Sequence, residues 1–242
     1  MKNENVNLLQ GNSGLIGILV AVFVVLLTGV FFLWKRRGTS RRGVLLYGLC
    51  DSGKTSLFSL LIYNKVLDTF TSLKENIGDY VIEGKAALKV VDVPGHERIR
   101  QRFLDKYHSS AHCLIFVIDS VTFTKEIRDV AECLYSVLVN PGVSSGCRSL
   151  LIVCNKQDQT LAKGAQLIKT QLEKEMNLLR TTRSNQLEAV SGSTNNNTFL
   201  GKPGKDFEFS HLQSSKVEFV EATCSGSNPD VGAVSKWIAT VA

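Results

Sequence analysis

The sequence lacks any charged side chain from Leu15 to Trp34, a run of twenty residues made mostly of Leu, Val, Ile and Phe. At a rise of about 1.5 Å per residue, a helix of this length crosses a hydrocarbon core of about 30 Å. The missing polar face argues against a buried or surface helix of a globular domain. The run ends in Lys35-Arg36-Arg37 instead of a small-residue cleavage site, which disfavours a cleaved signal peptide. We expect a retained transmembrane anchor over residues 15–34, after a short tail of residues 1–14.

The remaining chain lacks an excess of either charge. The net charge is +6, of which +5 comes from a basic linker, residues 35–42, so residues 43–242 carry only +1. A nearly neutral domain has little field with which to attract a polyanion, which argues against direct nucleic-acid binding. The linker follows the apolar run, where the positive-inside rule puts the cytosol and where basic side chains attract anionic membrane lipid. We therefore expect a luminal amino terminus and a cytosolic domain.

The cysteines lack the spacing of a metal site. There is no CxxC pair and no zinc-type histidine spacing among the six cysteines, so reduced and mostly buried thiols are expected. The glycosylation acceptor Asn196-Asn197-Thr198 would be silent in the cytosol.

Apolar runs alternate with helical patterns after the linker. Strands are expected at residues 44–47, 79–83, 87–91, 113–118, 150–154 and 217–220, and helices at 54–63, 125–138, 161–179 and 231–241. Continuous apolar runs indicate strands covered on both faces, with helices as crossovers. The pattern predicts an α/β domain over residues 43–242, with a mostly parallel six-stranded sheet and helices on both faces. Residues 181–215, rich in Ser, Thr, Asn and Gly, are expected to form a polar insertion.

The segment GLCDSGKT, from Gly48 to Thr55, matches the phosphate-binding pattern G-x-x-x-x-G-K-[ST] at every fixed position and lies between a strand and a helix. The glycines let backbone N–H groups surround a phosphate, the lysine adds a cation, and the threonine hydroxyl can ligate Mg²⁺. The expected phosphate-binding residues are Gly48, Asp51, Ser52, Gly53, Lys54, Thr55 and Ser56.

A second short motif, Asp92-Val93-Pro94-Gly95, follows the apolar strand 87–91. Asp92 would lie at the carboxyl end of that strand, beside the phosphate loop, where a carboxylate can hold Mg²⁺ through water. The N–H of Gly95 can meet a γ-phosphate. The tetrapeptide is a weak signal by itself, and its meaning comes from its position after the phosphate loop.

A third motif, Asn155-Lys156-Gln157-Asp158, follows the strand 150–154. The Asp158 carboxylate offers two acceptors to the N1–H and 2-amino groups of guanine, and adenine would leave it unpaired, so the motif favours GTP over ATP. A helix cap at Asn155 is a compatible structural interpretation. After the last strand, the loop containing Thr223 and Cys224 is placed where a backbone N–H can meet the guanine oxygen.

In this order and spacing, GLCDSGKT, DVPGH, NKQD and ATC resemble the Ras-like small GTPases, and the ATC loop resembles the Arf and Sar branch. With the amino-terminal anchor and the segments QLEKEMNLLRTTRS and LGKPGKDFEFSHL, the chain more specifically resembles the family of signal recognition particle receptor β subunits. The resemblance implies a membrane-anchored GTPase of the endoplasmic reticulum that functions in co-translational protein targeting. Its GTP-bound form would hold the amino-terminal domain of the receptor α subunit, with the ribosome and the translocon as further contacts.

The resemblance also implies roles for single residues. Thr71 would be the Mg²⁺ ligand of the first switch segment, with Ser72 as the alternative, because the segment 69–72 offers several hydroxyls. His96 stands where Ras has a water-orienting glutamine, so it is either a catalytic residue or a switch residue that faces a partner. The phosphates and Mg²⁺ would be contacted by Lys54, Thr55, Asp92 and Gly95. The guanine would be recognised by Asn155, Lys156 and Asp158.

Three functions remain open at this level. The protein can be a switch in which hydrolysis resets partner binding, or a constitutive anchor in which GTP is structural. An Arf-like or Sar-like GTPase of vesicle traffic is disfavoured, because such proteins use a removable amino-terminal helix where this chain has an expected spanning one.

Overall fold

The computed structural model describes residues 18–29, 42–190, 200–212 and 215–241. The chain divides into two compact units, Met1–Arg41 and Arg42–Ala242. In the first unit, residues 18–29 form a helix whose side chains are exposed. No helix within the described ranges is both long and apolar enough to cross a membrane. The other residues of the expected anchor lie outside the described residues.

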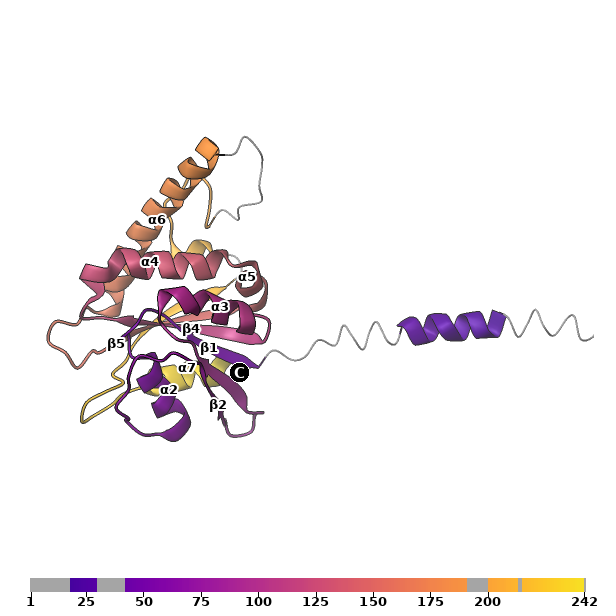
Figure 1. Ribbon diagram of the computed structural model, residues 1–242, viewed down its shortest axis with the longest axis horizontal. Helices are drawn as coiled ribbons and strands as arrows, with labels where there is room; N and C mark the ends of the chain where they lie inside the picture. Colours follow the sequence, from indigo (N-terminus) through magenta and orange to yellow (C-terminus); the bar gives the residue numbers. More distant parts are fainter. Residues whose placement is uncertain (1–17, 30–41, 191–199, 213–214, 242) are drawn as a thin grey trace, which may run out of the picture. The chain divides into compact units, whose positions relative to one another are not determined.

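The second unit is built on a six-stranded sheet with strand order β2-β3-β1-β4-β5-β6 (Figure 1). Strand β2 runs antiparallel to β3, and every other neighbouring pair is parallel. The expected mostly parallel six-stranded sheet is therefore confirmed. The strands are β1 (Gly43–Tyr47), β2 (Asn76–Tyr80), β3 (Leu88–Asp92), β4 (Ala111–Asp119), β5 (Ser149–Asn155) and β6 (Lys216–Glu221).

Helices cover both faces of this sheet, as Figure 1 shows. Each face has its own buried apolar cluster, and the buried runs of β4 and β5 contribute to both clusters because successive side chains point to opposite faces. One face carries α2 (Lys54–Tyr63) and α7 (Gly232–Val241). The other carries α3 (Glu97–Tyr107), α4 (Phe123–Val139), α5 (Pro141–Gly146) and α6 (Ala165–Val190).

Two elements differ from the expectation near the second motif. Helix α3 was not expected, because its sequence is dominated by charged residues. Phe103 and Tyr107, four residues apart, nevertheless pack against the core beside the buried Leu104. Strand β2 begins three residues earlier than the expected strand 79–83. Its pairing with β3, which places Asn76 opposite Asp92 and Tyr80 opposite Leu88, determines its position.

Helix α6 and the insertion also differ from the expectation. The helix begins at Ala165 and continues to Val190, past the expected end at residue 179 and into the expected polar insertion. The later part of the insertion, residues 200–212, is packed against the domain, with Leu200, Phe207 and Phe209 buried in the core cluster beneath α6. It includes a short 3-10 helix, η1 (Phe209–His211). Residue 196 lies outside the described residues.

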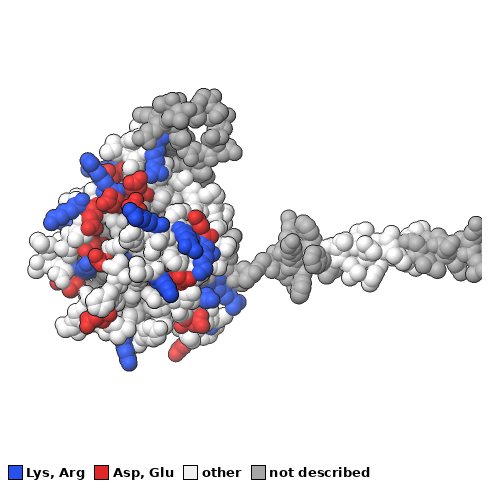
Figure 2. Space-filling view, viewed as in Figure 1, with Lys and Arg blue, Asp and Glu red and all other residues white. Residues whose placement is uncertain are grey.

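Acidic and basic side chains are interspersed on the face of the second unit seen in Figure 2. This distribution agrees with the near-neutral charge of residues 43–242 in the sequence. Five of the six cysteines are buried and Cys50 is half-buried, as expected for thiols of a packed domain.

Candidate functional site

The phosphate loop connects β1 to α2 through backbone conformations that favour glycine. Gly48 has φ +143° and Gly53 has φ +90°. A Cβ atom at Gly48 would lie 2.4 Å from the Val117 carbonyl oxygen, so neither conformation nor space permits a side chain there. The loop therefore brings its backbone N–H groups to the amino-terminal end of α2, where anions are stabilised.

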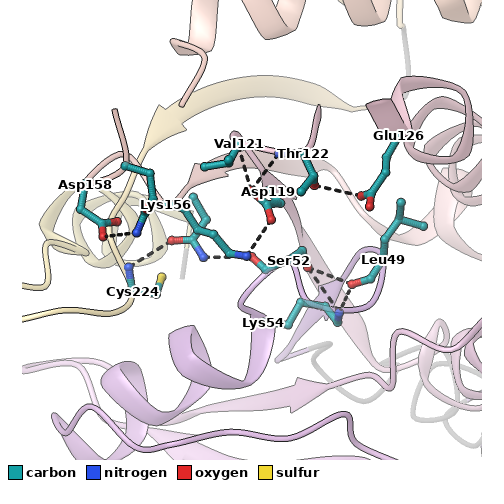
Figure 3. Close-up of polar contacts among 12 residues, drawn as sticks. Leu49, Ser52, Lys54, Asp119, Val121, Thr122, Glu126, Lys156, Asp158 and Cys224 are labelled. Carbon is teal, nitrogen blue, oxygen red and sulfur yellow. Dashed lines mark hydrogen bonds and ion pairs between the residues drawn. The ribbon is translucent and has the colours of Figure 1, made fainter. Parts of the chain in front are cut away.

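Lys54 is the first residue of α2 and is only 6% exposed. Its ammonium donates to the Leu49 carbonyl at 2.5 Å and lies 3.4 Å from the Ser52 hydroxyl oxygen, within the loop itself (Figure 3). Burial lowers the pKa of Lys54, and the nearby Asp92 carboxylate opposes that shift. A cation in this dry position interacts strongly with any anion that the loop surrounds.

Thr55 and Asp92 form the centre of a hydroxyl and carboxylate cluster. The Thr55 hydroxyl donates to Oδ2 of Asp92 at 2.8 Å, and the Asn76 amide donates to the same oxygen at 2.9 Å. Asp92 is 1% exposed, and its Oδ1 has no partner among the described residues. Burial raises the pKa of Asp92, and the two hydrogen bonds oppose that rise.

The first switch segment meets this cluster through Ser72. The Oγ atoms of Ser72 and Thr55 lie 3.4 Å apart, whereas Thr71 is exposed and lines the same cavity of about 50 Å³ beside the phosphate loop. Ser56 contacts Thr69 of this segment at 3.2 Å. The alternative, Ser72, is thus in contact with Thr55, Thr71 lines the same cavity, and the choice of ligand stays a prediction.

The second motif packs directly against the phosphate loop. A Cβ atom at Gly95 would lie 2.7 Å from the Cys50 backbone nitrogen and 2.8 Å from Nζ of Lys54. His96, the next residue, is exposed and caps α3, with its Nδ1 accepting from the Arg98 N–H at 3.4 Å. The ring is thus engaged at the start of α3, and its catalytic role stays a prediction.

At the base end, Asn155 joins the phosphate loop to the loop after β6. Its amide donates to the Ser52 carbonyl at 2.9 Å, and its Oδ1 accepts from the Cys224 N–H at 3.0 Å. The side chain is 1% exposed, and a Cβ at Gly53 would clash with it. A single amide therefore holds three segments that are far apart in the sequence.

Lys156 and Asp158 follow at the same sheet edge. Lys156 has φ +66° and pairs with Asp119 at 2.6 Å, and Figure 3 shows this pair beside Asp158 and Cys224. Burial raises the pKa of Asp119, but hydrogen bonds from Lys156 and the Val121 N–H outweigh it and lower that pKa overall. Asp158 is exposed, and its Oδ2 accepts from Gln159 at 3.2 Å. Its carboxylate is therefore accessible to a ligand.

The loop after β6 is held in place by hydrogen bonds from its own backbone. The backbone N–H groups of Ala222, Thr223 and Cys224 donate to Cys154, Asp230 and Asn155 respectively. All three groups are already paired within the protein because they hold the loop in position. The contact of this loop with the guanine oxygen stays a prediction.

Sequence reasoning missed two members of the site, Asn76 and Asp119. Asp119 ends β4 just as Asp92 ends β3 and Asn155 ends β5, and this shared position at strand carboxyl ends was the signal that could have found it. Asn76 carries no such signal, since its contact with Asp92 depends on the register of the β2–β3 pair.

The residues present fit a magnesium nucleotide. The unpaired buried Oδ1 of Asp92, with the Thr55 and Ser72 hydroxyls beside it, offers the oxygen ligands that Mg²⁺ prefers. A second cavity of about 490 Å³ is lined by Cys50 and Asp51 of the loop, by Gly95, and by Asp119 and Lys156. Together the two cavities extend from the α2 end toward the base-end residues.

Comparison with known proteins identifies the family. The family model described as signal recognition particle receptor beta subunit matches residues 39–217. The human signal recognition particle receptor subunit beta is 45% identical over 241 residues, covering 96% of this chain and 89% of that protein. This chain belongs to the signal recognition particle receptor β-subunit family.

Solved structures agree with this assignment. The chain in "The Structure of the Mammalian SRP Receptor" is 44% identical, with a TM-score of 0.73, and the match covers 83% of this chain and all of that one. The Ras-like GTPase fold is thereby confirmed. The Chaetomium thermophilum receptor β subunit, solved as a GTP complex with SRX, shares the fold at 22% identity and a TM-score of 0.66 over 84% of this chain and 99% of that chain.

Proposed function

We propose that this receptor β subunit is a membrane-anchored GTP switch that captures the receptor α subunit at the endoplasmic reticulum during co-translational protein targeting. The observation that carries the proposal is the cluster of Thr55, Ser72 and Asp92, which joins the phosphate loop, the first switch segment and the second motif. A ligand at this junction contacts both mobile segments of a GTPase and biases their arrangement.

In this proposal each residue of the site has a limited task. When bound, Mg²⁺ neutralises charge on the phosphates. Thr55 would hold it, with Asp92 through water and with Thr71 or Ser72 from the switch segment. Lys54 turns from the Leu49 carbonyl toward the phosphate oxygens. Gly95, packed against Cys50, presents its N–H to the terminal phosphate.

At the base end, Asp158 accepts hydrogen bonds from guanine, while Lys156, fixed by Asp119, keeps the strand terminus in position. Support for a nucleotide and a partner also comes from relatives. The titles of three Chaetomium thermophilum structures name the β subunit with GDP, with GDP and Mg, and with GTP and SRX. The partner that we propose here is the amino-terminal domain of the receptor α subunit.

Capture of that domain tests the switch. We load the full chain with GTP or GDP, verify the bound nucleotide, and measure binding of the α-subunit amino-terminal domain. The GTP form is expected to bind at least about tenfold more tightly, which corresponds to a coupling free energy of about 1.4 kcal/mol. Thr55→Asn, which removes a Mg²⁺ ligand, should weaken capture, and Thr55→Ser, which keeps the hydroxyl, should not.

Equal capture by correctly loaded GDP and GTP forms would instead support the constitutive anchor, in which the nucleotide is structural. The membrane part of the proposal, with residues 15–34 spanning, 1–14 in the lumen and 43–242 in the cytosol, is tested separately. In microsomes, Asn196 should stay unglycosylated, and added protease should digest the GTPase domain. Glycosylation at Asn196 would show the opposite orientation.

A further inference from the structure

A cavity of about 670 Å³ lies far from the nucleotide site, where β5 and β6 begin. Its lining combines three kinds of group: cations, hydroxyls and apolar side chains. The cations are Arg148, Lys169 and Lys216, the hydroxyls belong to Ser210 and Ser215, and the apolar side chains are Phe209, Leu212 and Val217.

The three cations come from three separate elements. Arg148 precedes β5, Lys169 lies on α6, and Lys216 begins β6. Within the described part of the chain, Arg148 and Lys169 form no ion pair, whereas Lys216 pairs with Glu218 at 3.0 Å. Glu173 lies one turn along α6 from Lys169, but its carboxylate already accepts a hydrogen bond from the Phe209 N–H at 3.1 Å. The cavity therefore keeps an excess of positive charge.

The walls of this cavity are held by hydrogen bonds and ring contacts. The Ser215 hydroxyl donates to the Cys147 carbonyl at 2.6 Å, and the Lys216 N–H donates to the Arg148 carbonyl at 2.9 Å. Phe209 packs edge-on against Phe219, with ring centroids 5.2 Å apart. A site whose walls are already ordered loses little entropy when a ligand binds.

The segment that supplies Phe209 is itself fixed by a buried arginine. Arg180, on α6 and 7% exposed, donates to the carbonyls of Leu200, Lys202 and Lys205. One guanidinium thus binds three carbonyls of the 200–212 segment and keeps it against α6.

The position of the cavity indicates its ligand. Ser149 and Lys216 pair at the amino edge of the parallel strands, the same edge at which Gly43 begins β1. Strand β6 lies three strand spacings from β1, or about 14 Å. The linker residues 35–42 precede Gly43 in the sequence, so the chain that leads from the proposed anchor joins the domain at this edge of the sheet.

We propose that this cavity binds the phosphate-bearing head group of an anionic phospholipid. Arg148 and Lys169 contact the phosphate, and the half-buried Leu212 contacts the first part of the lipid chains. The hydroxyl oxygens of Ser210 and Ser215, whose hydrogens are engaged by Glu208 and by the Cys147 carbonyl, accept from the polar head. The inference rests on the membrane anchoring proposed above. It adds a second lipid contact, distinct from the basic linker, which would fix the orientation of the GTPase domain on the membrane.

The test uses the full chain in nanodiscs of phosphatidylcholine with a photoactivatable phosphatidylinositol, and mass spectrometry of the crosslinked peptides. Peptides that contain residues 209–217 should carry lipid. The triple variant Arg148→Gln, Lys169→Gln, Lys216→Gln should lose about tenfold of that crosslinking, because each basic side chain contributes to binding an anionic surface. A matched variant with Arg98→Gln, Arg102→Gln and Lys125→Gln, on helices that begin at the nucleotide edge, should keep it.

Each other outcome has a definite meaning. Lipid on the linker but not on residues 209–217 in the inserted wild-type chain would overturn the inference, as would equal crosslinking of both triple variants. Displacement by micromolar soluble inositol phosphate would show a site for a free phosphate ester and would also overturn it. A chain that alkaline carbonate extracts from membranes would refute the proposed anchoring itself. GTP binding, measured in parallel, should be unchanged in both variants and shows that each one is folded.

Discussion

At the phosphate end of the site, Asp92 keeps one buried carboxylate oxygen without a partner among the described residues, whereas at the base end Asn155 uses both ends of its amide on the protein backbone. The phosphate end thus retains capacity for a metal ion, and part of its contact surface comes from the switch segment through Ser72. The base end is held together by protein contacts alone. A GTPase benefits from this difference, because the base end can hold the nucleotide while the phosphate end responds to it.

The largest expected effect is a change of base specificity. Asp158→Asn replaces one of the two acceptors by a donor, which clashes with guanine and suits xanthine. The preference for GTP over XTP should fall by a factor of about 10⁴, since a site built for specific hydrogen bonds strongly rejects a mismatched partner. Competition binding of labelled nucleotides measures this ratio. An unchanged preference for GTP would remove Asp158 from the base end.

The next largest effect comes from disrupting the hydrogen bonds that hold the base end together. Asn155→Ala leaves the Ser52 carbonyl and the Cys224 N–H without their buried partner and should reduce the free energy of unfolding by about 3 kcal/mol. Denaturant unfolding of the nucleotide-free chain measures the loss. Asn155→Asp should lose at least as much, because it keeps the acceptor for Cys224 but turns a buried carboxylate oxygen toward the Ser52 carbonyl. Equal stability of all three proteins would mean that this amide does not hold the base end together.

The third substitution, at Asp92, should stabilise the nucleotide-free protein but weaken its binding of GTP with Mg²⁺. Asp92→Asn removes a buried charge whose pKa is raised by burial, while the new side chain can still accept from Thr55 and Asn76. The nucleotide-free protein should gain about 1 kcal/mol of stability, and Mg²⁺-dependent GTP binding should weaken. Thermal unfolding with and without Mg²⁺ and GTP compares the two. Destabilisation in both states would show that Asp92 has a structural role instead.

The smallest effect concerns Glu75, which lies between the first switch segment and β2. Glu75 accepts from Lys106 at 2.6 Å and from the Tyr107 hydroxyl at 2.8 Å, which ties this part of the chain to α3. These bonds lower the pKa of Glu75 from 4.5 to about 2. Because the folded pKa is depressed, the stabilisation is present above pH 4.5 and is lost as the pH falls toward about 2.

Glu75→Gln should therefore reduce the free energy of unfolding by about 0.5 kcal/mol at pH 7, the size typical of an exposed ion pair. The difference from wild type should shrink in unfolding curves recorded between pH 4.5 and 2. Glu83→Gln, in the exposed β2–β3 turn, serves as the matched control. A constant difference across this pH range would contradict the proposed source of the stabilisation.

The amino-acid sequence by itself determined the strand–loop–helix unit of the phosphate site and the sheet edge on which the motifs gather. Helix α2 spans the expected residues, and each of the six observed strands overlaps an expected one, β2 only at residues 79–80. The agreement arises because a continuous apolar run and a glycine-rich loop are local signals. The amphipathic pattern of α3 was also local, but its high charge concealed it.

Contacts between distant residues were decided only by the tertiary structure. Strand register and loop packing decide three contacts: Lys156 with Asp119, Ser72 with Thr55, and the Cys224 N–H with Asn155. The same holds for the 200–212 segment, whose polar composition indicates a loop. Its burial follows from Arg180 and from Phe207 and Phe209, which meet α6 only after the chain has folded. A periodicity can reveal which face of an element is buried, but not which distant side chain will lie against it.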